Sequence, residues 1–201
     1  MRETRGDLLC FLNDDVEPLD DEWLVEMAAR ATSPGAGAVG ARLQYRDGTV
    51  QHAGIVVGLY GVASHLFRGL PPDHPGDALG RTMVARGVSA LSAACLLVGR
   101  DAFLAAGGFD ESLAVAFNDV DLCLRLRARG LRNVYTPHAR LVHDEGRSRG
   151  SDDSPRNRAR WHREERILRN RWRTDRFEDP FHSPNLSLRS FSATLAWPPR
   201  N

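Results

Sequence analysis

The sequence predicts an α/β fold in which short strands and helices alternate, followed by an arginine-rich helix and an irregular tail. Apolar runs of strand length are interspersed with segments whose apolar residues recur at helical spacing. The 201 residues can bury about 70% of the surface of the unfolded chain, so we expect one core of ordinary size. A hydrophobic content of 42%, with 26% charged residues and a net charge of +1, argues against disorder and against a general polyanion binder.

The first strand and helix are expected near the N-terminus. Residues 8–12 form an unbroken apolar run that ends at the polar residues 13–15, which is typical of a strand buried on both faces, as in a parallel sheet. Polar groups at the carboxyl end of such a strand are well placed for a ligand. A helix is predicted over 23–31, with Asp20 or Asp21 as its cap.

Two β-like segments and a long loop follow. Residues 37–43 and 50–58 are joined across Asp47 and Gly48, a dipeptide that favours a tight hairpin turn. Residues 60–87 are rich in Gly, Pro and His and have little periodicity, which predicts a long surface loop.

The alternation continues in the second half of the chain. Residues 89–99 are strand-like, and 100–106 read as a short helix that ends at two glycines. The apolar positions after Asp119 cover a broad helical arc up to Gly130. Two short strands are expected on either side of Pro137, so the core elements end near residue 143.

The C-terminal segment is rich in arginine. Residues 147–176 contain eleven arginines and five acids, and Trp161, Leu168 and Trp172 form one stripe at helical spacing. We expect this stripe to pack on the body of the protein. The proline-rich tail from Asp179 onward is expected to be irregular.

The composition excludes several classes of mechanism and location. All 27 basic residues are arginines, which excludes a Schiff-base or phosphate-loop lysine. Cys10, Cys95 and Cys123 lie in apolar runs and lack CxxC spacing, so we expect buried, reduced thiols. Neither a signal peptide nor a run of ~20 apolar residues is found, so we expect a cytoplasmic protein, free or peripheral at the inner face of the membrane.

Polar side chains stand at the ends of three predicted elements, at Asp14 and Asp15, at Asp119 and Asp121, and at His143. If the sheet brings them together, two oxygens and one nitrogen would hold a divalent cation, and a further carboxylate would be free to act as a base. Each also has a structural interpretation: turn residues, a helix cap, an ion pair between Asp121 and Arg125, or a hydrogen-bonded surface histidine.

A series of motifs in this order resembles family 2 glycosyltransferases of the O-antigen and rhamnan type, over essentially the whole chain. They are Phe11-Leu12-Asn13-Asp14-Asp15-Val16-Glu17-Pro18, Gly48-Thr49-Val50-Gln51-His52-Ala53-Gly54, Ala94-Cys95-Leu96-Leu97-Val98, Gly107-Gly108-Phe109-Asp110-Glu111, Phe117-Asn118-Asp119-Val120-Asp121-Leu122-Cys123-Leu124-Arg125, His143 with Ser148-Arg149-Gly150, and Asp179-Pro180-Phe181 with Pro184-Asn185-Leu186-Ser187. The resemblance implies a Rossmann-like glycosyltransferase A fold with a mixed sheet.

The resemblance also implies a reaction and its residues. Asp15 and His143 would bind Mn²⁺ or Mg²⁺ beneath the donor pyrophosphate, and Asp119 would be the general base that deprotonates the acceptor hydroxyl. One in-line displacement would invert the anomeric carbon. Other implied roles are donor binding by Asn13, Asp14, Arg147 and Arg149, an acceptor-side position for Gly108, Phe109, Asp110 and Glu111, and a supporting role for Asp121 and Arg125.

The resemblance finally implies what partners and parts to expect. Residues 1–146 would be the catalytic and acceptor part of the domain, and 147–201 its arginine-rich helix and wrap-around tail. Because the acidic motif starts at residue 13, the fold would be incomplete, lacking its N-terminal nucleotide-binding portion, and we expect self-association or completion by another polypeptide. The expected partners are a nucleotide-sugar donor and a glycan or lipid-linked glycan acceptor, without nucleic acid. The alternative is a non-catalytic remnant or a binding module with an arginine-rich surface.

Overall fold

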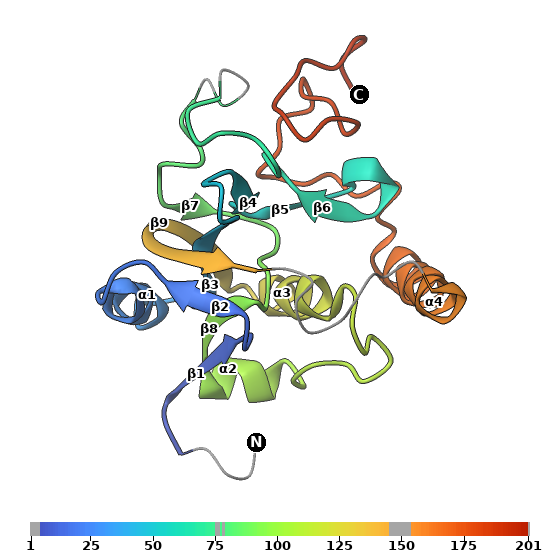
Figure 1. Ribbon diagram of the computed structural model, residues 1–201. Coiled ribbons are helices and arrows are strands. Elements are labelled where there is room, and N and C mark those ends of the chain that lie inside the picture. The colour runs from blue at the N-terminus through green and yellow to red at the C-terminus, as the bar shows by residue number, and fades with distance from the viewer. Residues whose placement is uncertain (1–4, 75–76, 78, 145–153, 201) are drawn as a thin grey trace.

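The computed structural model describes residues 5–74, 77, 79–144 and 154–200. Within these residues a seven-stranded sheet has the order β1-β8-β3-β9-β2, with β4 paired to β3 and β7 paired to β9 (Figure 1). Its strands are β1 (Leu8–Leu12), β2 (Val16–Pro18), β3 (Ala36–Gln44), β4 (Val50–His52), β7 (Arg86–Gly87), β8 (Cys95–Gly99) and β9 (Arg132–His143). A separate two-stranded ribbon consists of β5 (Ile55–Val57) and β6 (Ala63–His65).

The sheet is mixed, as the sequence predicts. β3 and β9 run parallel, whereas β1 with β8, β3 with β8 and β2 with β9 are antiparallel. The expected hairpin across Asp47 and Gly48 is present, because β3 and β4 are antiparallel and Gly48 has a φ of 84°.

Helices cover both faces of the sheet. The helix α1 (Trp23–Ala31) packs on one face, where Met27 lies in an apolar cluster with Val39 and Leu141. The helices α2 (Arg100–Ala105) and α3 (Asn118–Ala128) pack on the other face, in a cluster that also takes in Leu168 of α4 (Pro155–Trp172). The result is an α/β/α arrangement, with the β5–β6 ribbon next to β4 and above α3 in the view of Figure 1.

The first strand differs from its prediction. β1 lies at the end of the strand order and pairs with β8 only among the described residues, so it is an edge strand and not one buried on both faces. Cys10 is therefore exposed, in contrast to the buried thiols of Cys95 and Cys123, and Leu12 is 45% exposed. An apolar run marks a strand but does not show how many neighbours it has.

Two other predicted segments are divided differently by the fold. The segment 50–58 is two strands, because Gly54 adopts a φ of 98° between β4 and β5, a conformation that favours glycine. The predicted loop 60–87 contains β6 and β7, and its Leu66 and Phe67 are buried in the core. It is therefore only partly a surface loop.

Three boundaries also differ from the sequence predictions. In the range 89–99, only Cys95–Gly99 forms a strand, and the two strands expected around Pro137 are one strand, β9, whose pairing with β3 shifts register there. α1 is capped by Glu22 without a side-chain hydrogen bond, and not by Asp20 or Asp21. Local sequence does not determine these limits, because partner strands supply the hydrogen bonds that extend or end an element.

α4 begins at a capped N-terminus and packs through part of the expected stripe. Ser154 accepts a hydrogen bond from the amide of Asn157 at 3.2 Å. Leu168 is fully buried and Trp172 packs against the core, whereas Trp161 is 42% exposed. Among the described residues, no helix has the length and apolar character to cross a membrane.

Acidic partners hold several of the arginines of α4. Arg169 pairs with Glu165 at 3.1 Å, and Arg171 reaches Asp110 and Asp121 at 2.7 and 2.8 Å. These contacts favour a helix packed on the domain over a helix that presents its arginines as a separate binding surface.

Candidate functional site

The turn after β1 brings Asp15 to the end of β9. Val16 of β2 pairs with His143 in an antiparallel register, which sets the Asp15 and His143 side chains next to each other. Asp15 Oδ1 lies 3.1 Å from His143 Nε2, and the Asn13 amide nitrogen lies 3.4 Å from the same ring nitrogen. Asp14 lies exposed in the same turn. Residues 128 positions apart in the chain thus form one cluster.

Gln51 orients the imidazole of His143. Gln51 Oε1 lies 2.6 Å from His143 Nδ1, and the Gln51 amide nitrogen donates to the His143 carbonyl at 3.3 Å. Because a carbonyl oxygen only accepts, Nδ1 of His143 carries the hydrogen of this contact, and Nε2 is the ring nitrogen that faces Asp15. Sequence reasoning assigned no role to Gln51, although it lies in one of the quoted motifs.

The Asp15–His143 pair fits a divalent cation. Asp15 Oδ1 is buried without a hydrogen bond and lies beside a ring nitrogen, an arrangement that a bound cation satisfies. Two neighbouring ligands of an octahedral ion lie about 3.0 Å apart when each bond is about 2.1 Å, close to the separation found here. In the described part of the chain no group of three or more His, Cys, Asp or Glu side chains is placed to hold a metal ion. Of the described residues, Asp15 and His143 would supply two ligands, and phosphate and water are suited to other positions of the ion.

Asp119 lies in the first turn of α3, and two backbone amides hold its carboxylate. Its Oδ2 accepts the amide hydrogen of Ala93 at 3.1 Å and its Oδ1 that of Val120 at 2.8 Å. Burial raises the pKa of Asp119, and these hydrogen bonds partly oppose the rise. The N-cap of α3 is Phe117, so Asp119 is not the cap. Phe117 has a φ of 64°, a backbone conformation that is uncommon for a bulky residue. Strained conformations of this kind are found most often at functional sites.

The segment 92–94 joins these parts of the site. The backbone N–H of Asn13 donates to the carbonyl of residue 94 at 3.0 Å. The backbone N–H of residue 93 donates to Asp119, and that of residue 92 donates to Nε2 of His52 at 3.4 Å. The acidic turn and the carboxylate of α3 are therefore both hydrogen-bonded to one short segment.

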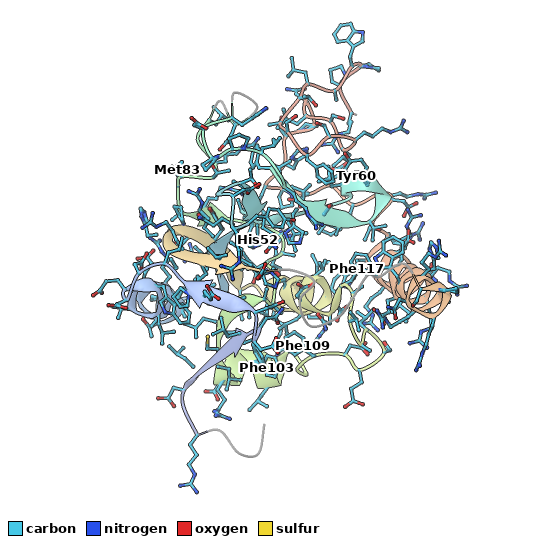
Figure 2. All side chains as sticks on the ribbon, viewed as in Figure 1. His52, Tyr60, Met83, Phe103, Phe109 and Phe117 are labelled. Atoms are coloured by element: carbon cyan, nitrogen blue, oxygen red, sulfur yellow. The ribbon has the colours of Figure 1, made fainter. Side chains whose placement is uncertain are left out.

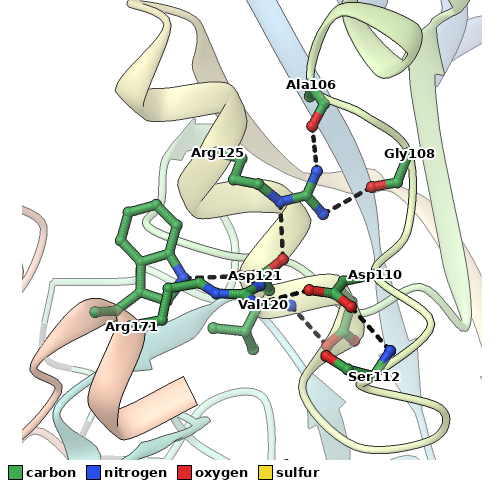
Figure 3. A network of polar contacts seen from close by, with 10 residues as sticks. Ala106, Gly108, Asp110, Ser112, Val120, Asp121, Arg125 and Arg171 are labelled. Atoms are coloured by element: carbon green, nitrogen blue, oxygen red, sulfur yellow. Dashed lines mark hydrogen bonds and ion pairs between the residues drawn. The ribbon is translucent and has the colours of Figure 1, made fainter. Parts of the chain in front are cut away.

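Asp121 has a different environment from Asp119. Its carboxylate is fully buried and accepts from Arg125 Nε, Arg171 Nη1 and Trp172 Nε1, each at 2.8 Å (Figure 3). The ion pair with Arg125 predicted from spacing is present. Asp121 therefore ties α3 to α4.

The same network holds the glycine-rich segment before α3. Arg125 also donates to the carbonyls of Ala106 and Gly108, the latter at 2.7 Å (Figure 3). Hydrogen bonds from the side chain and amide of Ser112, together with the ion pair to Arg171, lower the pKa of Asp110 to about 2. Gly108 and Asp110 thus have structural contacts, and their acceptor-side position stays a prediction.

The other two residues expected on the acceptor side, Phe109 and Glu111, differ in their surroundings. The Phe109 ring packs on Phe11 and Phe103, with centroids 4.8 and 5.5 Å away, while Glu111 is exposed. The donor-side residues Arg147 and Arg149 lie outside the described residues, as does the predicted boundary at 146–147.

A cavity of about 630 Å³ opens beside Asp119. It is lined by the ribbon, by the segment before α3 and by the first turns of α4, with Ile55, Ala63, Ser64, His65, Arg68, Val115, Ala116, Phe117, Val120, Asn157, Arg158, Arg160, Trp161 and His162 as further lining residues. The sequence does not indicate this cavity, because His65 lies in the predicted surface loop and Trp161 in the predicted packing stripe.

Comparison with known proteins places the chain in a family. Residues 1–164 match the family described as "Glycosyltransferase like family 2". The O-antigen biosynthesis protein RfbC of Myxococcus xanthus is 44% identical over 154 residues, which are 77% of this chain and 12% of that protein. The N-acetylglucosaminyl-diphospho-decaprenol L-rhamnosyltransferase of Mycobacterium tuberculosis is 34% identical over 158 residues, 73% of this chain and 50% of that enzyme. The chain thus spans half or less of these relatives.

A solved structure shows the same fold. A mannosyltransferase from Pyrobaculum calidifontis, solved in complex with GDP-Man and Mn²⁺, superposes with a TM-score of 0.53 and 15% sequence identity. The match covers 89% of this chain and 42% of the mannosyltransferase. The α/β fold with its mixed sheet is therefore similar to that of glycosyltransferases of the A type. Since the family model spans most of its residues, this chain belongs to glycosyltransferase family 2.

Proposed function

We propose that the protein transfers a sugar from a nucleotide-sugar donor to a hydroxyl of a cell-surface glycan precursor, with inversion at the anomeric carbon and with Mn²⁺ or Mg²⁺ as cofactor. The observation that carries this proposal is that the turn holding Asp15, which pairs with His143, and the carboxylate of Asp119 are hydrogen-bonded to neighbouring residues, Ala94 and Ala93. The names of the O-antigen biosynthesis protein and of the rhamnosyltransferase support a polysaccharide precursor as acceptor.

Asp15 and His143 would hold the divalent cation, with Gln51 fixing the ring of His143. When bound, the cation stabilises negative charge on the leaving nucleoside diphosphate. Asn13 and Asp14 would contact the donor beside this pair. Arg147 and Arg149 would bind its diphosphate, since guanidinium groups match the geometry of phosphate. The Mn²⁺ and GDP-Man named for the mannosyltransferase support this arrangement.

Asp119 would take the proton of the acceptor hydroxyl. The acceptor oxygen forms a bond to the anomeric carbon as the bond from that carbon to the diphosphate oxygen breaks, and the electron pair leaves with the diphosphate. The displacement occurs in one step, so no glycosyl-enzyme intermediate is formed. Burial supports the basicity of Asp119, because a raised pKa strengthens the conjugate base.

The first test is calorimetry with Mn²⁺ and a panel of nucleoside diphosphates. We expect binding that needs Mn²⁺ and is weakened at least about tenfold by Asp15→Ala, because the variant removes one of two protein ligands. Asp21→Ala is the matched control, since it removes an exposed carboxylate at the same cost in charge. A folded chain that binds none of the diphosphates, or an Asp15→Ala variant that binds as tightly as the wild type, contradicts the proposal.

A further inference from the structure

The outer side of α4, at the edge of the molecule in Figure 1, carries exposed arginines. Arg163, Arg166 and Arg173 follow one another at steps of three and seven residues, a spacing that places them on one side of a helix. Leu168 on the opposite side is fully buried. Among the described residues, the guanidinium groups of these three arginines have neither an ion pair nor a hydrogen bond. The packing of α4 on the domain therefore leaves three positive charges facing solvent.

The acids of α4 do not neutralise this side. The sequence of the helix contains two of them, Glu164 and Glu165. Glu164 is fully buried, and its carboxylate accepts from backbone amides that precede α3. Glu165 pairs with Arg169 at 3.1 Å. An exposed helix face with arginines and without a carboxylate attracts anions.

Two exposed aromatic rings lie beside the C-terminal end of α4. Tyr60 belongs to the short helix η1 (Leu59–Gly61) between β5 and β6, and its ring centroid lies 4.9 Å from that of Phe191 in the tail. Tyr60 is 49% exposed and Phe191 is 38% exposed. Thr174, which follows α4, donates to the carbonyl of Gly61 at 3.0 Å, so η1 adjoins the end of the helix. Figure 2 shows Tyr60 above α4.

The backbone of the tail holds Tyr60 in place. Tyr60 has a φ of 54°, which is uncommon for a bulky residue, and its N–H donates to the carbonyl of Leu188 at 2.8 Å. Arg189 comes next in the chain, between this contact and Phe191. Its side chain is exposed and has no partner within the part of the chain that the structure describes. A fourth arginine thus lies close to the ring pair.

We propose that these side chains form one surface that binds an anionic phospholipid bilayer. The basic–aromatic surface consists of Arg163, Arg166, Arg173, Arg189, Tyr60 and Phe191. Its arginines contact lipid phosphates, and its rings enter the boundary between the headgroups and the acyl chains. Because η1 and the tail form part of it, the surface belongs to the packed domain and not to an isolated helix. The inference goes beyond the proposed function and does not depend on it.

A bilayer fits this surface better than a nucleic acid duplex does. Both offer phosphates to the arginines, but only a bilayer offers an apolar layer to the exposed rings. The two rings already pack on each other, tilted by 49°, and so form a single apolar projection. Arginine side chains also have apolar stems that can lie along such a boundary. The net charge of +1 for the whole chain is low for a protein that binds nucleic acid through charge.

Flotation of the full chain with lipid vesicles tests the surface. The vesicles contain either phosphatidylcholine alone or phosphatidylcholine and phosphatidylglycerol in equal parts. At ~0.1 M NaCl we expect binding to the anionic vesicles to be at least about tenfold tighter than to the neutral ones, because each arginine near the bilayer contributes about fivefold. Raising the salt to ~0.5 M should remove most of this difference, since it screens the charges.

Substitutions separate the surface from the net charge of the chain. The double variant Arg163→Gln with Arg166→Gln keeps two good helix formers, and we expect it to bind the anionic vesicles at least about tenfold more weakly than the wild type. Arg5→Gln with Arg129→Gln is the matched control, because it removes the same charge from two exposed arginines outside the surface. We expect the control to bind within about threefold of the wild type.

A variant at Tyr60 tests the contribution of the rings. Tyr60→Asn removes the ring but keeps a residue that tolerates a positive φ. We expect about threefold weaker binding to the anionic vesicles, because the variant loses an aromatic side chain at the bilayer boundary.

Equal binding of the wild type to neutral and anionic vesicles would overturn the inference, as would equal binding by the two double variants. A short DNA duplex is added as a competitor. If the wild type binds the duplex more tightly than the anionic vesicles, and the Arg163→Gln, Arg166→Gln variant does not, the surface binds nucleic acid and the inference is wrong. Mn²⁺-dependent binding of nucleoside diphosphate is measured on the same samples. Its retention in a chain that ignores anionic vesicles refutes the bilayer surface and leaves the proposed function standing.

Discussion

Asp119 and Asp121 lie two residues apart but differ in what surrounds their carboxylates. Asp119 accepts only backbone hydrogen bonds among the described residues and borders a cavity. Asp121 is fully buried and accepts from two arginines and a tryptophan. At the scale of single residues, one carboxylate is therefore available for chemistry and the other is committed to structure.

Substitutions at the two aspartates should separate activity from stability. Asp119→Asn keeps the shape of the side chain but only one of its two acceptor oxygens, so we expect it to lower the free energy of unfolding by about 1 to 2 kcal/mol and sugar transfer by at least about 100-fold. Asp121→Ala should lower the free energy of unfolding by about 3 kcal/mol, because it leaves Arg125 and Arg171 without their shared partner.

Urea denaturation and the release of nucleoside diphosphate from nucleotide sugars measure these two effects. In the wild type, release should slow as the pH falls through the raised pKa of Asp119, because the base must be ionised. An Asp119→Asn variant that retains full activity would contradict the role of this residue.

At the scale of elements, α4 positions the segment that precedes α3. The Glu164 side chain is fully buried, and its Oε2 accepts from the amide of Ala116 at 2.6 Å and from that of Val115 at 3.4 Å. The next residue, Phe117, has the unusual positive φ that begins α3. Contacts from a helix about 50 residues later thus stabilise the backbone next to Asp119.

Truncation of Glu164 should therefore be costly. We expect Glu164→Ala to lower the free energy of unfolding by about 3 kcal/mol, since it leaves buried amides unsatisfied and opens a cavity. Glu164→Gln should cost less than about 1 kcal/mol, because it keeps an acceptor oxygen. Glu165→Ala, which breaks the more exposed pair with Arg169, is the control and should cost about 0.5 kcal/mol. Equal losses in urea denaturation for the Glu164→Ala and Glu165→Ala variants would argue against this positioning.

At the scale of the whole molecule, the sheet has β1 at one end of its strand order. Cys10 and Leu12 are exposed on this strand, which pairs with β8 only within the described residues. Unpaired strand edges with apolar side chains promote association between chains. Self-association stays a prediction, which the exposed edge of β1 motivates.

Light scattering after size-exclusion chromatography tests this association. We expect the wild type to form oligomers and Cys10→Lys to shift the population toward monomers, because a lysine on an edge strand disfavours pairing. Leu195→Lys changes an exposed residue of the tail and should have no effect. A monomeric wild type would show that β1 does not drive association.

The sequence by itself determined the alternation of strands and helices, the hairpin at Asp47–Gly48, the ion pair of Asp121 with Arg125 and the family resemblance. These follow from local periodicity, turn chemistry and short spacing, which are properties of neighbouring residues. Only the tertiary structure decided that β1 is an edge strand, that Gln51 orients His143, and that His65 and Trp161 border one cavity with Asp119. These features depend on contacts between residues far apart in the chain, and local patterns contain no information on such contacts.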